Sequence, residues 1–458
     1  MNARPVWRRC GLLAVSMSSL LNGCALIHHD GAPHAPVAPE QIEVANDIHL
    51  PPGGWPAARW WTRYGDAQLD AFIEQALAAA PTMVIARTRV AQAKSDVELV
   101  RTGSNLQVVA LALLNQQHVS AHGFLGPFAQ DVPAEGLTGP WYTEGIVGLG
   151  ASLNIDIWGK QRAQIAASVG VSNARLAEMS AVELEISTDV AQLYYGIQTN
   201  YQLIELLNES RAVAAFAVHA QNQVRQLRES LRALAGATPD GLRDIEPVAL
   251  PPAQAALPAT LSYELLARRP DLQAMRWYVQ SSFDRIDAAK AAFYPSFDIK
   301  AFFGFDALHL RDLFMHSSQQ INLIPGLYLP IFDGGRLNAN LSGAREGSNL
   351  LIEQYNQAVL NAVRDVAQTG SRLQALDSEA ALQQRRIASV AYVRDSVEAH
   401  YRRGLTSQLA AFEARQPVIA EQVALLTLSG QMLSQEIALT KALGGGYRAD
   451  PPVELQPR

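Results

Sequence analysis

The residues of this chain that could do chemistry are scattered and match no familiar catalytic arrangement. None of the ten histidines stands in an HExxH motif or near cysteines at metal-binding spacing. No serine occupies a GxSxG elbow, and the glycine-rich stretches "DGGR" and "GGG" lack the context of a phosphate-binding loop. We therefore expect no enzymatic activity, no metal and no cofactor.

An acidic pair lies near residue 400. Asp395 and Glu398 are three residues apart, so they share one face of a helix. Arg394 precedes them and could bridge the carboxylates. The alternative is an ordinary solvated helix face.

The N-terminus has the segment order of a secretory signal. Arg4, Arg8 and Arg9 precede an apolar run, "GLLAVSMSSLL", which is too short to remain as a membrane span. The pair of arginines leaves a twin-arginine signal as an alternative, although no further part of that motif surrounds it.

Cys24 is a candidate for lipidation. The stretch 21–24, "LNGC", resembles the lipobox at which bacterial lipoproteins are cut, which predicts a signal peptide over residues 1–23. Ala25 follows, as is typical of sorting to the outer membrane. An acylated cysteine anchors a protein without spanning the bilayer. Cys10 would leave with the signal, so the mature chain would hold no free thiol and no disulfide. The alternative is a plain signal with an incidental cysteine.

Composition limits the classes of protein to which the chain can belong. Its 458 residues, 48% hydrophobic and 17% charged, suffice for about three ordinary domains. The net charge of -6 argues against a nucleic-acid partner. After the signal, no stretch approaches the roughly 18 uninterrupted apolar residues of a membrane helix, so any spanning part must be a closed sheet.

The chain contains an internal duplication. "LNIDIWGKQRAQIAAS" at 153–168 and "LPIFDGGRLNANLSGA" at 329–344 correspond at an offset of 176, and the same offset relates "DVAQ" at Asp189 to "DVAQ" at Asp365. One ungapped register over this length predicts two halves of one fold. The expected organisation is a proline-rich, lipid-anchored segment, a first repeat, a proline-rich linker, a second repeat and a tail, at 24–58, 59–236, 237–263, 264–446 and 447–458.

Each repeat contains two candidate strands. Apolar and small or polar residues alternate in 146–157, 297–306 and 321–331, and more weakly in 106–119. Runs of this length suit an outer-membrane strand, which needs about 9 to 11 residues. The alternative is a soluble hairpin with one buried face.

Long helices follow the strands. The stretches 160–212 and 336–392 contain no proline and predict helices about 80 Å long with coiled-coil packing. Shorter helices are expected at 66–101, kinked at Pro81, and at 406–443, closed by "GGG". Four strands leave two unpaired edges, so the chain must oligomerise or not span at all.

Together these motifs resemble the TolC-like outer-membrane efflux proteins, in the NodT-type lipoprotein branch, and above all the multidrug-resistance outer-membrane lipoproteins. The resemblance rests on "WWTRYGDAQLDAFIEQAL" from Trp60, "GPWYTEG", "DIWGKQRA", "ARRPDLQA", "AAKAAFYPSF", "LPIFDGGRLNANL" and "ALGGGY". It implies an α+β membrane protein whose homotrimer shares one 12-stranded β-barrel in the outer-membrane lipid and extends a periplasmic α-barrel of coiled-coil helices. The implied function is a passive duct that docks a periplasmic adaptor and an inner-membrane transporter.

The resemblance also implies roles for individual residues. Three copies would bring six carboxylates of Asp395 and Glu398 together at the tunnel aperture, where they would favour cations and oppose closure unless Arg394 bridges them. The strand-to-helix turns would use Gly159, Gly334 and Gly335. The adaptor would meet a hairpin tip made of Tyr401, Arg402, Gly404, Leu405 and Ser407.

The first repeat departs from the family pattern. Between Tyr392 and Ala442 lie 49 residues, whereas between the counterparts Phe216 and Ala233 lie only 16, so 33 residues are missing, and we place the gap after His219. The first repeat has therefore lost its own hairpin tip. This leaves an alternative function, a non-conducting or decayed structural lipoprotein that forms a trimeric coiled coil.

Overall fold

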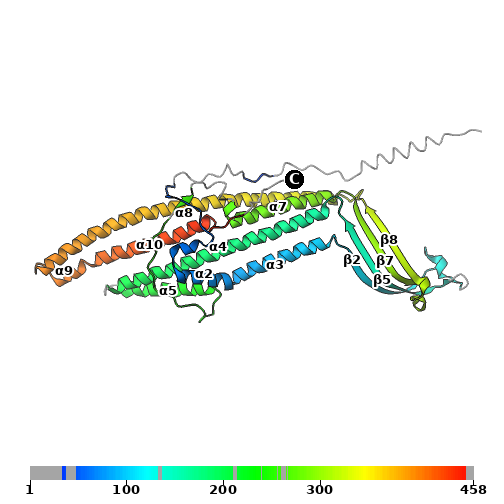
Figure 1. The fold of residues 1–458 in the computed structure, drawn as a ribbon, viewed down its shortest axis with the longest axis horizontal. Coiled ribbons are helices and arrows are strands. Elements are labelled where there is room, and N and C mark those ends of the chain that lie inside the picture. Colours follow the sequence, from blue (N-terminus) through cyan, green and yellow to red (C-terminus); the bar gives the residue numbers. More distant parts are fainter. Residues whose placement is uncertain are drawn as a thin grey trace, which may run out of the picture.

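The computed structural model describes residues 34–37, 48–132, 137–209, 214–238, 240–254, 256–258, 265 and 267–449. The expected signal peptide and Cys24 lie outside the described residues. The molecule is elongated, with one sheet at one end and long helices running away from it (Figure 1).

The sheet consists of four antiparallel strands in the order β2-β5-β7-β8. They are β2 (Gln107–His118), β5 (Trp141–Ile155), β7 (Ser296–Ala307) and β8 (Gln319–Tyr328). The four predicted strands are confirmed, although β5 begins five residues earlier than expected, because it continues to pair with β2 as far as Trp141 opposite His118.

Strand register joins the apolar residues into one face. Leu149 lies opposite Phe303, and Phe303 in turn lies opposite Ile321. All three side chains are exposed in the single chain, as expected of a sheet face that meets lipid. The outer edges of β2 and β8 have no strand partner among the described residues.

The two longest helices are repeat counterparts. α4 (Lys160–Glu209) has 50 residues and α8 (Arg336–Arg402) has 67, so they extend about 75 and 100 Å. Both predicted long helices are confirmed. α4 ends slightly before the expected position, and α8 continues ten residues beyond it.

Proline explains two interruptions among the shorter helices. α2 (Ala67–Ala79) and α3 (Pro81–Thr102) meet at a 47° bend, as predicted for Pro81. The single helix expected at 406–443 is wrong, because α9 (Gln408–Glu413) and α10 (Gln416–Ala442) are separate and Pro417 occupies the start of the second.

Among the described residues, no single helix is long and apolar enough to cross a bilayer. The bent pair of α2 and α3 would pass together, by length and composition only.

The helices form two hydrophobic cores, and α10 of the second repeat contributes to the first of them. In the first, Trp60 and Tyr194 lie among side chains of α2, α4, α5 (Ala214–Leu234) and α10. In the second, Val279 of α7 (Pro270–Ala291) packs with Ile352 and Tyr355 of α8. Apolar residues spaced three and four apart place an apolar stripe on one side of each helix, and these stripes meet in the cores.

Extended segments bind both long helices in the same way. The Gln198 side chain of α4 donates to the Glu246 carbonyl oxygen (2.9 Å) and accepts from the Val248 amide (2.8 Å). Its counterpart Gln374 on α8 accepts from the His49 amide at 3.0 Å. The described parts of the N-terminal segment and of the linker are therefore packed against the helices, and their two short strands, β1 (Pro52–Gly53) and β6 (Leu257–Pro258), pair in parallel.

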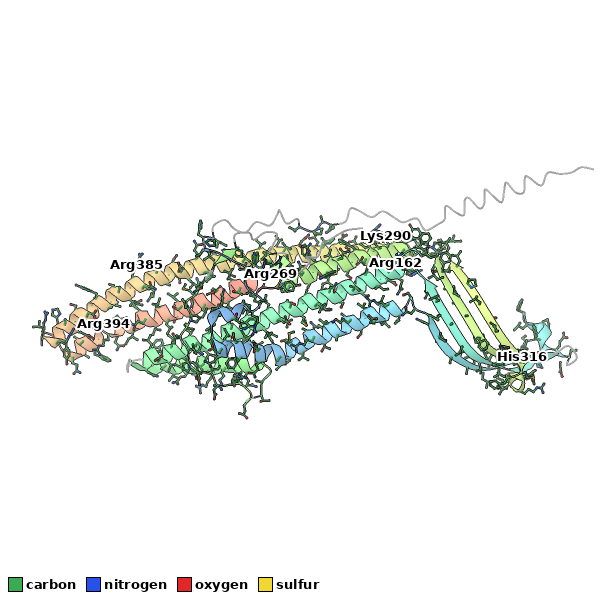
Figure 2. All side chains as sticks on the ribbon, viewed as in Figure 1. Arg162, Arg269, Lys290, His316, Arg385 and Arg394 are labelled. Atoms are coloured by element: carbon green, nitrogen blue, oxygen red, sulfur yellow. The ribbon has the colours of Figure 1, made fainter. Side chains whose placement is uncertain are left out.

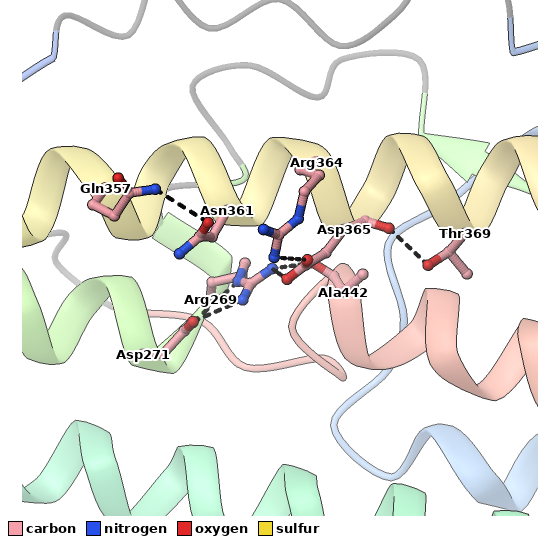
Figure 3. A network of polar contacts seen from close by, with 8 residues as sticks. All are labelled: Arg269, Asp271, Gln357, Asn361, Arg364, Asp365, Thr369 and Ala442. Carbon is pink, nitrogen blue, oxygen red and sulfur yellow. Dashed lines mark hydrogen bonds and ion pairs between the residues drawn. The ribbon is translucent and has the colours of Figure 1, made fainter.

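A polar network joins α7, α8 and α10 in the second repeat (Figure 3). The Arg269 guanidinium donates to both carboxylate oxygens of Asp271, at 3.1 and 2.7 Å, and lies 3.6 Å from Asp365. It also donates to the Ala442 carbonyl oxygen at the end of α10 (3.4 Å). One largely buried cation therefore holds the beginning of α7, the middle of α8 and the end of α10 together.

Candidate functional site

The end of the hairpin formed by α8, α9 and α10 holds the predicted tip residues together. After Arg402 the chain turns through Gly404, whose φ of 76° favours glycine. The Leu405 amide donates to the His400 carbonyl oxygen (2.9 Å), which closes the end of α8. The Ser407 hydroxyl accepts from the Ala410 amide (3.1 Å) and begins α9. Tyr401 and Leu405 are exposed at this turn.

The aperture candidates lie near this end of α8, where Figure 2 shows Arg394. Arg394 donates to one carboxylate oxygen of Asp395 from Nε (2.9 Å) and Nη2 (2.7 Å). Glu398 receives a hydrogen bond from Arg415 Nε of the returning helical arm at 2.8 Å. Both carboxylates therefore have a guanidinium partner within the chain, which lowers the repulsion expected between copies.

Arg415 was missed by sequence reasoning. It lies 17 residues after Glu398 and approaches it only because the chain folds back at Gly404. Because the hairpin was predicted, a basic residue on its second arm, at about the same distance from the turn as Glu398, could have been identified as a partner.

Glycines with positive φ join the strands to the long helices. φ is 78° at Gly159, 66° at Gly334 and 87° at Gly335, and α4 and α8 begin directly afterwards. An aspartate precedes each turn: Asp156 accepts from the Arg162 amide (2.9 Å) and Asp333 from the Leu337 amide (2.7 Å). These carboxylates, which sequence reasoning missed, satisfy free amides at the helix starts.

A large open cavity lies where the sheet meets the helices. Its volume is about 1470 Å³, and the ends of α3, α4, α7 and α8 surround it. Charges of both signs line it, including Asp96, Lys160, Arg285 and Arg336. Trp158 and Tyr294, also in the lining, stack with ring centroids 5.0 Å apart. The lining therefore combines charged, aromatic and apolar side chains at the junction of sheet and helices.

Comparison with known proteins identifies the family. The family model described as "Outer membrane efflux protein" matches residues 72–226 and 261–445, which is most of the chain. The chain belongs to the outer membrane efflux protein family. It is an outer-membrane channel component of an efflux system, as the sequence motifs predicted.

Two relatives within the outer membrane efflux protein family show how far the similarity extends. The multidrug resistance outer membrane protein MdtP of Escherichia coli (strain K12) is 51% identical over 477 residues, with 97% of each chain covered. MdtQ of Escherichia coli O157:H7, also named a multidrug resistance outer membrane protein, is 39% identical over 461 residues, with 94% of this chain and 96% of MdtQ covered.

Solved structures share the fold of this chain. The outer-membrane channel OprN matches with a TM-score of 0.77 and 20% identity, with 92% of this chain and 99% of OprN covered. The predicted TolC-like α+β fold is therefore confirmed.

Proposed function

We propose that three copies of this chain form a passive duct across the outer membrane and periplasm, docked to a periplasmic adaptor and an inner-membrane transporter. The duct carries drugs or similar small molecules, a proposal that rests on the names of MdtP and MdtQ. The observation that supports assembly is that α3 and α8 each expose a face whose repeat counterpart is buried.

Within the chain, α7 lies between the two long helices. The Ser281 hydroxyl of α7 donates to the Ala167 carbonyl oxygen of α4 (2.8 Å), and the Tyr278 hydroxyl donates to Glu178 (2.8 Å). Burial and the Glu178 carboxylate raise the pKa of Tyr278 to about 12, so this hydroxyl remains a donor at neutral pH. On its other face, α7 contacts α8 through Ser282 and Ser348 (2.9 Å).

α3 is the counterpart of α7, but within the described part of the chain it packs mainly on one long helix, α4. Both helices have 22 residues and begin with proline, so Gln92 and Leu99 correspond to Ser281 and Ala288. Ala288 is buried, whereas Leu99 is 71% exposed. α7 packs against α4 with one face, and the corresponding face of α3 is therefore exposed to solvent in the single chain.

α8 likewise exposes a face whose counterpart on α4 is buried. Gly170 of α4 faces α7, since a Cβ placed on it would lie 3.0 Å from the Ser281 Cβ, and Ala174, about one turn further along α4, is buried. Their counterparts at the offset of 176 are Glu346 and Leu350, and Leu350 is 60% exposed. The duplication therefore supports packing of α8 against α3 of the next copy, which repeats the contact of α4 with α7 around a ring.

This arrangement predicts a disulfide between copies. Gln92→Cys combined with Glu346→Cys reproduces the close contact of Ser281 with Gly170, so mild oxidation should give a covalent trimer on a denaturing gel. The mismatched pair Lys94→Cys and Glu346→Cys should remain monomeric, because Lys94 is turned away from Gln92 on α3. Equal cross-linking by both pairs would contradict the proposed register.

Transport itself is tested by drug accumulation in cells that lack their own duct but contain a matched adaptor and transporter. We expect the native chain to lower accumulation severalfold relative to cells without it. Unchanged accumulation, with the chain present as trimers in the outer membrane, would instead favour the non-conducting structural lipoprotein.

Anchoring by Cys24 is part of the proposal, with the described N-terminal segment bound to α8. The His34 amide donates to the Asn349 side chain (3.1 Å), and the Val37 amide donates to that of Asn356 (2.8 Å). These bonds support a segment that runs along the helix from the direction of the sheet.

A further inference from the structure

The two repeats differ most at the end that lies far from the sheet. α4 and α5 are joined by residues 210–213 alone, whereas the hairpin of the second repeat extends well beyond them (Figure 1). At the repeat offset of 176, Glu209 corresponds to Arg385. Beyond the gap the offset increases by the 33 missing residues to 209, so Ala214 of α5 corresponds to Val423 of α10. Residues 386–418, 33 in number, therefore have no counterpart in the first repeat.

The structure corrects the position of the missing segment. His219, after which we placed the gap, lies inside α5, so an insertion there would interrupt a helix. The gap falls between α4 and α5. The alignment with MdtP independently supports missing residues. It extends over 477 positions, more than the 458 residues of this chain, so some positions of MdtP have no counterpart here.

The protruding hairpin is held by its own contacts. At its base, the buried Gln383 side chain donates to the Glu421 carbonyl oxygen across the two arms at 2.9 Å. Further out, Arg415 binds Glu398, and Gly404 and Ser407 shape the turn. The hairpin therefore needs no support from the first repeat to present its tip.

We infer that this chain offers the adaptor one docking tip per chain, where an intact duplication would offer two. A trimer would then bind three adaptor molecules at full occupancy rather than six. The inference rests on the proposed docking function of the tip. The exposed Leu405 at the turn, 68% accessible, is the apolar contact that the single site supplies.

Adaptor stoichiometry tests this inference. The probe is the purified adaptor protein that supports efflux with this chain in cells, added in excess to the purified trimer. A repaired chain carries a second copy of residues 386–418 inserted after Glu209. Native mass measurement should give one adaptor per native chain and two per repaired chain, a twofold difference.

Leu405→Asp in the original hairpin provides the internal control. It should abolish binding to the native chain and reduce the repaired chain from two adaptors to one, whereas Leu405→Met should change neither number. Two adaptors on the native chain would overturn the inference and leave the docking function intact. Binding to neither chain would overturn the proposed function, and this inference with it. If the repaired chain fails to assemble, the number on the native trimer decides alone.

Discussion

Replacement of Glu436 by alanine should destabilise the first helical core by about 3 kcal/mol. This carboxylate of α10 is 2% exposed and is bound by the Arg63 guanidinium and by the Gln254 amide at 2.9 Å. Its loss leaves Arg63 partly buried without a counter-charge. Because the Arg63 side chain is 40% exposed, we expect the lower end of the range for breaking a buried pair.

Denaturation of the detergent-solubilised chain by urea, followed by circular dichroism, measures this change. Glu74→Ala is the matched control, because Glu74 pairs with Arg59 on the surface and should contribute less than about 1 kcal/mol. Similar effects of the two substitutions would show that the Glu436 contacts contribute little to stability.

Replacement of Leu350 by aspartate should abolish assembly and thereby efflux. Leu350 is exposed in the single chain, so the change should not alter the fold of the protomer. In the proposed ring it corresponds to Ala174, which is fully buried, and a carboxylate there would be desolvated without a partner. Drug accumulation should return to that of cells without the channel.

Blue native electrophoresis of membrane extracts would follow the loss of trimers directly. Leu350→Met keeps the volume and apolar character and should retain both trimers and efflux. Trimers of the aspartate variant in wild-type amounts would place this face of α8 outside the interface.

Most of the secondary structure could be predicted because it depends on local patterns. Alternation with a period of two located all four strands, and the absence of proline located α4 and α8. The errors arose where local patterns were misjudged. The break before Pro417 was overlooked, and α8 was ended early because its last turns lie in a protruding hairpin with few buried side chains.

The candidate site was predicted in part. The turn around Gly404 follows from glycine and serine chemistry that acts within a few residues. The partner of Glu398 could not be predicted in the same way, since Arg415 reaches it through the pairing of two helical arms.

The sequence by itself determined the duplication, the apolar face of each strand, the long helices and the 33-residue deficit, because residue order and spacing encode them directly. The tertiary structure decided which groups are paired and where the deficit lies. Glu436 meets Arg63 across 373 positions of the chain, and the gap falls between α4 and α5 rather than after His219. Such facts depend on how helices pack and where they end, which periodicity leaves open because many registers bury the same apolar stripe.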